Sequence, residues 1–159
     1  MLLKDYQEKI LELFVQLELD MSGLYSLFAV KFPKYKNLWA TLSQQELDHA
    51  ERVKKLWFLA SKNKIVFEEK LTKTYTVKRV LDSVKDAYAN AKADKMNLMT
   101  ALSVSRDFEQ SIIEKEFYNF FTGKDPETRV LINSIKGETL VHQSMLKNAW
   151  EEERKITLR

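Results

Sequence analysis

Apolar residues recur along most of the chain at alternating spacings of three and four, which is typical of helices that bury one side. The first such segment covers about residues 3–31, and Pro33 ends it because the residue before a proline avoids the helical conformation. The second covers about residues 35–60. The turn between them is short, so we expect an antiparallel pair. The expected buried positions are Leu11, Phe14, Glu18, Met21, Tyr25, Phe28, Trp39, Leu42, Glu46, His49, Val53, Leu56 and Ala60.

A long connection follows the second helix. The helical spacing is lost over residues 61–74, which we interpret as an irregular connector, and it returns over residues 77–93 as a narrow apolar stripe. We expect this short helix to pack outside the bundle or at its end. A connection of this length is too long for a simple hairpin and favours a long crossover, as in ferritin-like topology.

Two more long helices are predicted, over about residues 94–121 and 126–155. Gly123 is the expected end of the first, Asp125 the cap of the second, and Pro126 its first residue. The expected buried positions are Leu98, Leu102, Ser105, Glu109, Ile112, Glu116, Leu131, Ile135, Glu138, His142, Met145 and Ala149. The pattern thus predicts two antiparallel hairpins joined by a crossover, that is, a four-helix bundle with an extra short helix.

Composition agrees with an all-α protein. Three Gly, two Pro and 31% charged residues in 159 favour helix, and the length suits one domain over residues 1–159. The absence of Cys excludes disulfides, thiolate zinc sites and iron–sulfur centres. A net charge of +3 with interleaved signs predicts no nucleic-acid partner. We find no signal-peptide core and no run of roughly 18 apolar residues, so no membrane span and a cytoplasmic location are expected.

Acidic and histidine residues interrupt the buried sides at matching places. Glu46 and His49 lie one turn apart on the second helix, and a buried carboxylate and imidazole are costly unless they are paired or bind a metal. The two halves repeat this arrangement: Glu18 precedes His49 by 31 residues, and Glu109 precedes His142 by 33. These are the only two His in the chain.

Carboxylates and imidazoles from four helices can hold two iron or manganese ions. In this interpretation Glu18 and Glu109 are terminal ligands, Glu46 bridges the ions, and each His caps one of them. Glu138 lies about 40° from His142 around the helix and faces the same way. Tyr25 and Tyr118 either fill the core, which is the commoner role, or hydrogen-bond the site. The predicted metal ligands are Glu18, Glu46, His49, Glu109, Glu138 and His142.

The sequence resembles the rubrerythrin-like branch of the ferritin-like di-iron carboxylate superfamily over nearly its whole length. The resemblance is carried by Glu18 with Tyr25 one heptad later, FP-x4-LW before QELDHAERV, AL-x6-E ending at Glu109, and ETLVH ending at His142. It implies a four-helix site with two non-haem iron ions, redox chemistry with O₂ or peroxide (peroxide reductase or ferroxidase-like), an unidentified electron donor, and usually dimers. Trp39, Trp57 and Trp150 could mark such a homodimer interface.

The sequence departs from that family at three places. The second Glu-x-x-His of the family would place a glutamate at position 139, where this chain has Thr139. A second glutamate three residues from Glu109 is also absent, since Arg106 and Ile112 stand there. The rubredoxin electron-transfer segment is missing. The alternative interpretation is therefore a non-catalytic bundle that serves as an interaction or scaffold protein.

Overall fold

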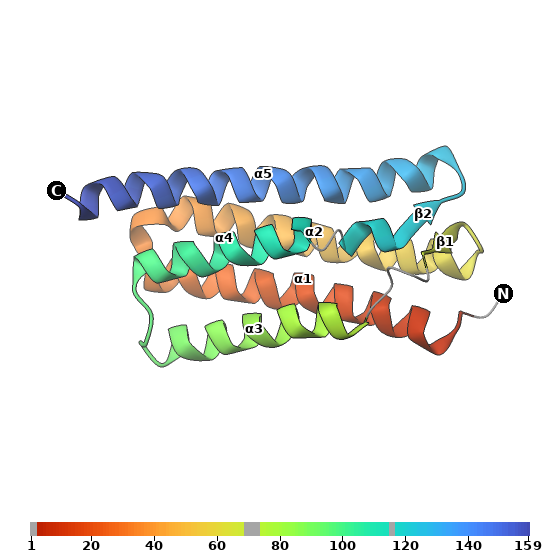
Figure 1. The fold of residues 1–159 in the computed structure, drawn as a ribbon, viewed down its shortest axis with the longest axis horizontal. Helices are drawn as coiled ribbons and strands as arrows, with labels where there is room; N and C mark the ends of the chain where they lie inside the picture. Colours follow the sequence, from red (N-terminus) through yellow and green to blue (C-terminus); the bar gives the residue numbers. More distant parts are fainter. Residues whose placement is uncertain (1–2, 69–73, 115–116) are drawn as a thin grey trace.

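The computed structural model describes residues 3–68, 74–114 and 117–159, and their fold is all-α with one small sheet. Helix α1 (Asp5–Lys31) and α2 (Lys36–Ser61) are joined by the short 3₁₀ helix η1 (Pro33–Tyr35). They run antiparallel in tight contact (Figure 1), as the short turn predicts. All thirteen positions expected on their buried sides are buried.

The crossover runs the length of the molecule. Helix α3 (Thr74–Lys92) lies alongside α1, so that α4 starts at the end of the bundle opposite to the end of α2 (Figure 1). Its buried residues Val77, Leu81 and Val84 continue the expected stripe. Helix α4 (Leu98–Glu114) then packs antiparallel against α5 (Pro126–Thr157), and α5 also contacts α2.

The third long helix is shorter than predicted at both ends. Asp94 has a positive φ of 58°, and the Asn97 side chain accepts a hydrogen bond from the Thr100 amide at 2.8 Å, so α4 begins at Leu98. The helix ends at Glu114 instead of Phe121, and Glu116 lies outside the described residues. The fourth helix begins as predicted, because Asp125 caps it by accepting a hydrogen bond from the Thr128 amide at 2.8 Å.

Aromatic packing explains the early end of α4. The rings of Phe117, Tyr118, Phe120 and Phe121 all lie 5.3–6.1 Å from the ring of Phe14 on α1. A regular helix would spread these four side chains over about 160°. The tighter 3₁₀ helix η2 (Phe117–Phe120) and strand β2 (Phe121–Gly123) let them surround one side chain.

The connector after α2 also contains structure that the sequence analysis missed. Strand β1 (Ile65–Phe67) pairs antiparallel with β2, with Ile65 opposite Gly123 and Phe67 opposite Phe121. Gly123 is needed at this edge because a Cβ atom there would lie 2.7 Å from the Arg129 backbone nitrogen. It therefore ends a strand, and the prediction that it ends a helix is wrong.

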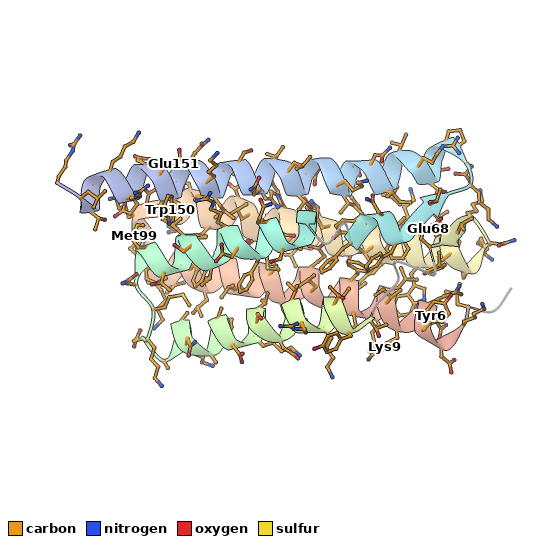
Figure 2. The ribbon with its side chains drawn as sticks, viewed as in Figure 1. Tyr6, Lys9, Glu68, Met99, Trp150 and Glu151 are labelled. Atoms are coloured by element: carbon orange, nitrogen blue, oxygen red, sulfur yellow. The ribbon has the colours of Figure 1, made fainter. Side chains whose placement is uncertain are left out.

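The structure bears on the expectation that the tryptophans mark an interface. Trp39 is fully buried and stacks on Tyr25 at 5.9 Å, so it cannot mark an interface. Trp150 lies on the side of α5 that faces α4, opposite to Glu151 (Figure 2), and its indole donates a hydrogen bond to Ser103 at 2.8 Å. The guanidinium groups of Arg106 and Arg154 also lie over its ring, 5.0 and 5.3 Å from the ring centroid.

Helix α1 has one further property. Among the described residues, it is the single helix long and apolar enough to cross a membrane by length and composition. This is weak evidence, because a core helix of a soluble protein meets the same criteria and half of its apolar window is buried within the bundle.

Candidate metal centre

Five of the six predicted ligands meet in the interior of the bundle. Each comes from the predicted buried side of its helix, and none is more than 2% exposed. Helix α1 supplies Glu18, α2 supplies Glu46 and His49, α4 supplies Glu109, and α5 supplies His142. Two imidazoles and three carboxylates therefore share one water-poor space.

Glu46 lies between the two histidines. Its Oε2 atom is 3.1 Å from Nδ1 of His49, and its Oε1 atom is 3.0 Å from Nδ1 of His142. The imidazole rings stack with centroids 5.0 Å apart and planes 20° apart. Ligand atoms of these three residues lie within 4.8 Å of one another, close enough to hold one metal ion together. Glu46 is thus the carboxylate shared by both halves of the cluster.

Each histidine also faces a carboxylate of its own. Nδ1 of His49 is 3.7 Å from Oε2 of Glu18, and Nδ1 of His142 is 3.7 Å from Oε1 of Glu109. The cluster therefore divides into two similar halves, each with one imidazole and one terminal carboxylate, on either side of Glu46. This is the arrangement that the internal repeat predicts.

A tyrosine from across the bundle holds each terminal carboxylate. Tyr25 of α1 donates a hydrogen bond to Glu109 at 2.8 Å, and Tyr118 of η2 donates one to Glu18. Burial and the neighbouring carboxylates raise the pKa of both phenols well above the usual value. Both tyrosines therefore remain protonated donors, and both also fill the core, so the two roles weighed for them coexist.

The outer ring nitrogens of the histidines are also paired. Nε2 of His49 lies 2.5 Å from Oε2 of Glu138, and Nε2 of His142 lies 2.7 Å from Oε1 of Gln45. Gln45 immediately precedes Glu46, and Glu138 immediately precedes the corresponding position 139. Metal-binding histidines usually donate the second ring N–H to such a partner, which fixes the tautomer with its free nitrogen toward the metal. The sequence analysis missed Gln45, although its position in the repeat is the signal that identifies it.

The prediction that Glu138 lies on the buried side of α5 is wrong. The buried residues there are Ile132, Thr139 and Leu146. Each lies one position after a residue that was expected to be buried, namely Leu131, Glu138 and Met145. The Glu138 side chain is 38% exposed and forms an ion pair with Arg52 at 2.8 Å. Burial opposes ionisation of Glu138, but hydrogen bonds from Arg52 and His49 outweigh it and lower its pKa.

Thr139 occupies the inner position that mirrors Glu46. Its side chain is buried, and its hydroxyl donates a hydrogen bond to the Ile135 carbonyl at 3.0 Å. Ile112, one turn after Glu109, is buried as well. Among the side chains that the structure describes, the cluster therefore has one shared carboxylate, and the second half lacks a counterpart to it.

Without a metal, protons balance the charges of this cluster. Burial, Glu18 and Glu109 raise the pKa of Glu46 well above its usual value. Burial opposes protonation of the imidazoles, but hydrogen bonds to the carboxylates outweigh it and raise the pKa to about 11 for His49 and about 9 for His142. Burial would likewise raise the pKa of Glu18, yet its hydrogen bonds to Glu46 and His49 lower it.

These shifts predict a pH dependence for the metal-free protein. A histidine whose pKa is higher folded than unfolded stabilises the fold fully below its unfolded pKa, near 6.5, and loses that contribution as the pH rises to the folded value. We expect the free energy of unfolding in the presence of a chelator to fall between pH 6.5 and 9 through both histidines, with a further and shallower decline toward pH 11 through His49 alone. Urea unfolding across this range measures it, and the slope should shrink in the double variant His49→Gln, His142→Gln. A flat profile in the parent protein would contradict the expected charge state.

The donor set suits a cation that prefers oxygen and imidazole ligands. Carboxylate and imidazole suit iron and manganese, and the buried carboxylates supply negative charge that a cation would neutralise in place of the protons. The sequence matches no protein-family model and no curated protein, and the structure matches no solved structure. The geometry of the cluster therefore carries the functional interpretation.

Proposed function

We propose that the protein is a ferritin-like four-helix bundle that binds two iron or manganese ions and uses them in redox chemistry with O₂ or peroxide. The observation that carries this proposal is the orientation of the two imidazoles. Both turn Nδ1 toward the shared carboxylate of Glu46 and present Nε2 to an acceptor outside the cluster. A structural ion pair needs no such matched orientation, whereas a metal-binding histidine does.

Each residue has a defined part in this proposal. Glu46 would be shared by the two metal positions, His49 with Glu18 would complete one, and His142 with Glu109 would complete the other. Glu138 and Gln45 hold the imidazoles from outside, so we assign Glu138 this positioning role in place of the predicted ligand role. These residues would hold the metal, which when bound in its reduced form would supply the electrons for reduction of O₂ or peroxide. The surrounding core keeps bulk water away.

A second function is favoured by Thr139 and Ile112. Their side chains leave the second half without an additional carboxylate, and a bundle that needs no metal could keep the remaining cluster as a proton-balanced ionic core. In that case the protein acts as an interaction or scaffold module. The two functions differ in one measurable quantity, the amount of metal bound at the cluster.

Anaerobic titration with Fe²⁺ tests the proposal. We expect close to two ions per chain, because two similar half-sites share Glu46. His142→Gln should keep only the ion bound by His49, which separates binding at the cluster from binding at surface carboxylates. One ion in the parent protein would mean that Thr139 breaks the second position. No bound ion would overturn the metal proposal and favour the scaffold function.

A further inference from the structure

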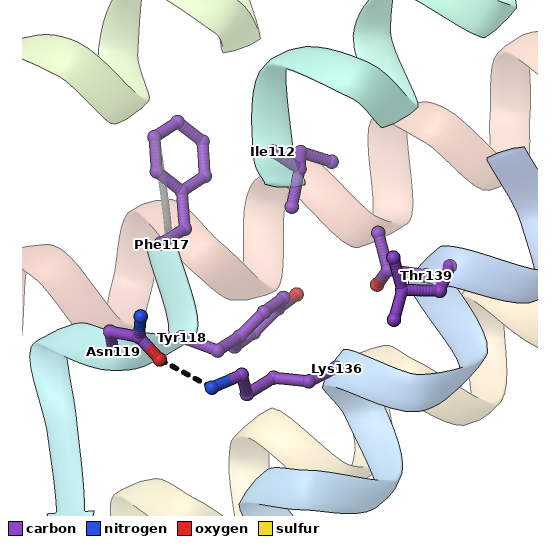
Figure 3. A pocket seen from close by; sticks show the side chains of 7 residues that line it. Ile112, Phe117, Tyr118, Asn119, Lys136 and Thr139 are labelled. Atoms are coloured by element: carbon purple, nitrogen blue, oxygen red, sulfur yellow. Dashed lines mark hydrogen bonds between the residues drawn. The ribbon is translucent and has the colours of Figure 1, made fainter. Parts of the chain in front are cut away.

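A cavity of about 200 Å³ lies directly beside the candidate metal centre. Three residues that line the cavity adjoin a proposed ligand. Ile112 follows Glu109 by one helical turn, and Thr139 precedes His142 by one turn. The hydroxyl of Tyr118 is hydrogen-bonded to Glu18. Figure 3 shows these three side chains converging from α4, α5 and η2. A molecule in this cavity would lie next to both halves of the cluster.

The walls of the cavity are mainly apolar. Ile112 and Phe117 form the inner part and are buried, while Leu140 is 52% exposed and marks where the cavity opens to solvent. An apolar cavity of about 150 Å³ accepts benzene, so this slightly larger one has room for an aromatic ring or a short alkyl chain with one small substituent.

The polar groups that line the cavity include one cation, Lys136. The Thr139 hydroxyl already donates to the Ile135 carbonyl, and the Tyr118 hydroxyl donates to Glu18. The half-buried ammonium group of Lys136 donates to the neutral amide oxygen of Asn119 (Figure 3). Within the described residues it forms no ion pair with a carboxylate. An ammonium group has three donors and prefers a charged acceptor, so the cavity is suited to one anionic group.

We propose that this cavity binds a small molecule that combines one carboxylate group with an aromatic or short alkyl body. The carboxylate pairs with Lys136, and the body packs against Ile112, Phe117 and Leu140, with its inner end toward Thr139 and the metal centre. The inference deepens the proposed function by naming the class of organic substrate. It rests on that function only for the reaction, because binding in the cavity requires no metal.

Benzoate is a suitable probe, and the metal-free protein is the right sample because no ion can then coordinate the carboxylate. We expect saturable binding of one benzoate per chain, measured by chemical-shift titration, with contacts from the benzoate ring protons to the Ile112 methyl groups. Benzyl alcohol has the same body without the charge, and acetate has the charge without the body. Both should bind at least about tenfold more weakly, since each lacks one of the two contacts.

Two substitutions at the cavity sharpen the test. Lys136→Met keeps the aliphatic stem, removes the charge, and should weaken benzoate binding at least about tenfold without changing benzyl alcohol binding. Leu140→Trp fills the exposed opening and should abolish binding of both, with little risk to folding. Lys147→Met, at an exposed position of the same helix, is the matched control and should bind as the parent does.

The outcomes separate this inference from the metal proposal. No saturable binding, equal binding to Lys136→Met, or equal affinity for benzyl alcohol would overturn the assigned ligand class. Benzoate binding with an unsuccessful Fe²⁺ titration would leave the cavity assignment intact and reject the metal centre. Iron binding without benzoate binding would leave the metal proposal intact and reject the cavity assignment.

Discussion

Replacement of Glu46 by glutamine is expected to abolish tight metal binding at both positions. Within the described part of the chain, Glu46 is the one residue that contacts the inner nitrogens of both histidines, at 3.1 and 3.0 Å, so its loss removes a ligand from each half at once. The affinity for Fe²⁺ should fall by more than the roughly 10- to 100-fold that loss of an outer hydrogen-bond partner costs. Metal analysis after anaerobic reconstitution, together with calorimetric titration, measures the change.

The same substitution should leave the helical fold intact. Burial and the charges of Glu18 and Glu109 disfavour the ionised form of Glu46 and raise its pKa, so this acid costs stability in the folded protein. Glutamine has the same shape and no ionisable group, so the metal-free variant should be at least as stable as the parent at neutral pH. The control is Glu51→Gln on the same helix, whose side chain is 72% exposed and which should bind metal normally. Unchanged metal content in Glu46→Gln would exclude the bridging role.

The long helices and most of the cluster were predictable because one physical rule governs both. A helix in a bundle must bury one side, and Glu18, Glu46, His49, Glu109 and His142 each interrupt an otherwise apolar side. The buried sides of four packed helices face a common interior, so polar residues at similar heights on those sides come into contact. Their spacing along the sequence therefore predicted their convergence, although a pattern alone cannot say whether a metal or protons balance their charge.

The one-position error on α5 has a physical origin. The pairs Leu131 with Met145 and Ile132 with Leu146 are both apolar and both spaced by 14 residues, so either could mark the buried side. The rotation of α5 against its neighbours buries the second pair and leaves the first at the edge. The rotation of a helix about its axis depends on packing against its neighbours, and the sequence of that helix alone does not determine it. This uncertainty is also why Thr139 and Glu138 could not be assigned from the sequence.

The contacts that complete the site were beyond the sequence for a related reason. Hydrogen bonds from Tyr25 to Glu109 and from Tyr118 to Glu18 join residues 84 and 100 positions apart, and they depend on the relative heights of packed elements. Tyr118 also belongs to a segment that the periodicity placed in a regular helix. Its 3₁₀ conformation follows from the aromatic packing around Phe14, which is a tertiary effect.

The second large effect is expected at Thr139, the position that mirrors Glu46. Thr139→Glu should raise the affinity for Fe²⁺ by about tenfold or more, because it adds a carboxylate at the inner face of α5, one turn from His142. The metal-free variant should be less stable by about 1–3 kcal/mol, because another buried acid enters an already acidic interior. Thermal unfolding with and without Fe²⁺ measures both effects. Lower affinity than the parent would mean that position 139 cannot reach the ions.

Glu138 supplies the complementary test, and the protein contains its own control. Gln45 already accepts the hydrogen bond from His142 as a neutral amide, so Glu138→Gln should hold His49 equally well and keep the metal stoichiometry unchanged. Glu138→Leu removes the acceptor and should weaken Fe²⁺ binding about 10- to 100-fold. If Glu138 were a ligand, a neutral amide could not replace its charge, and Glu138→Gln would lose one ion. That result would move Glu138 from outer support to the metal, and it would make Thr139→Glu nearly silent because the carboxylate that α5 contributes would already be in place.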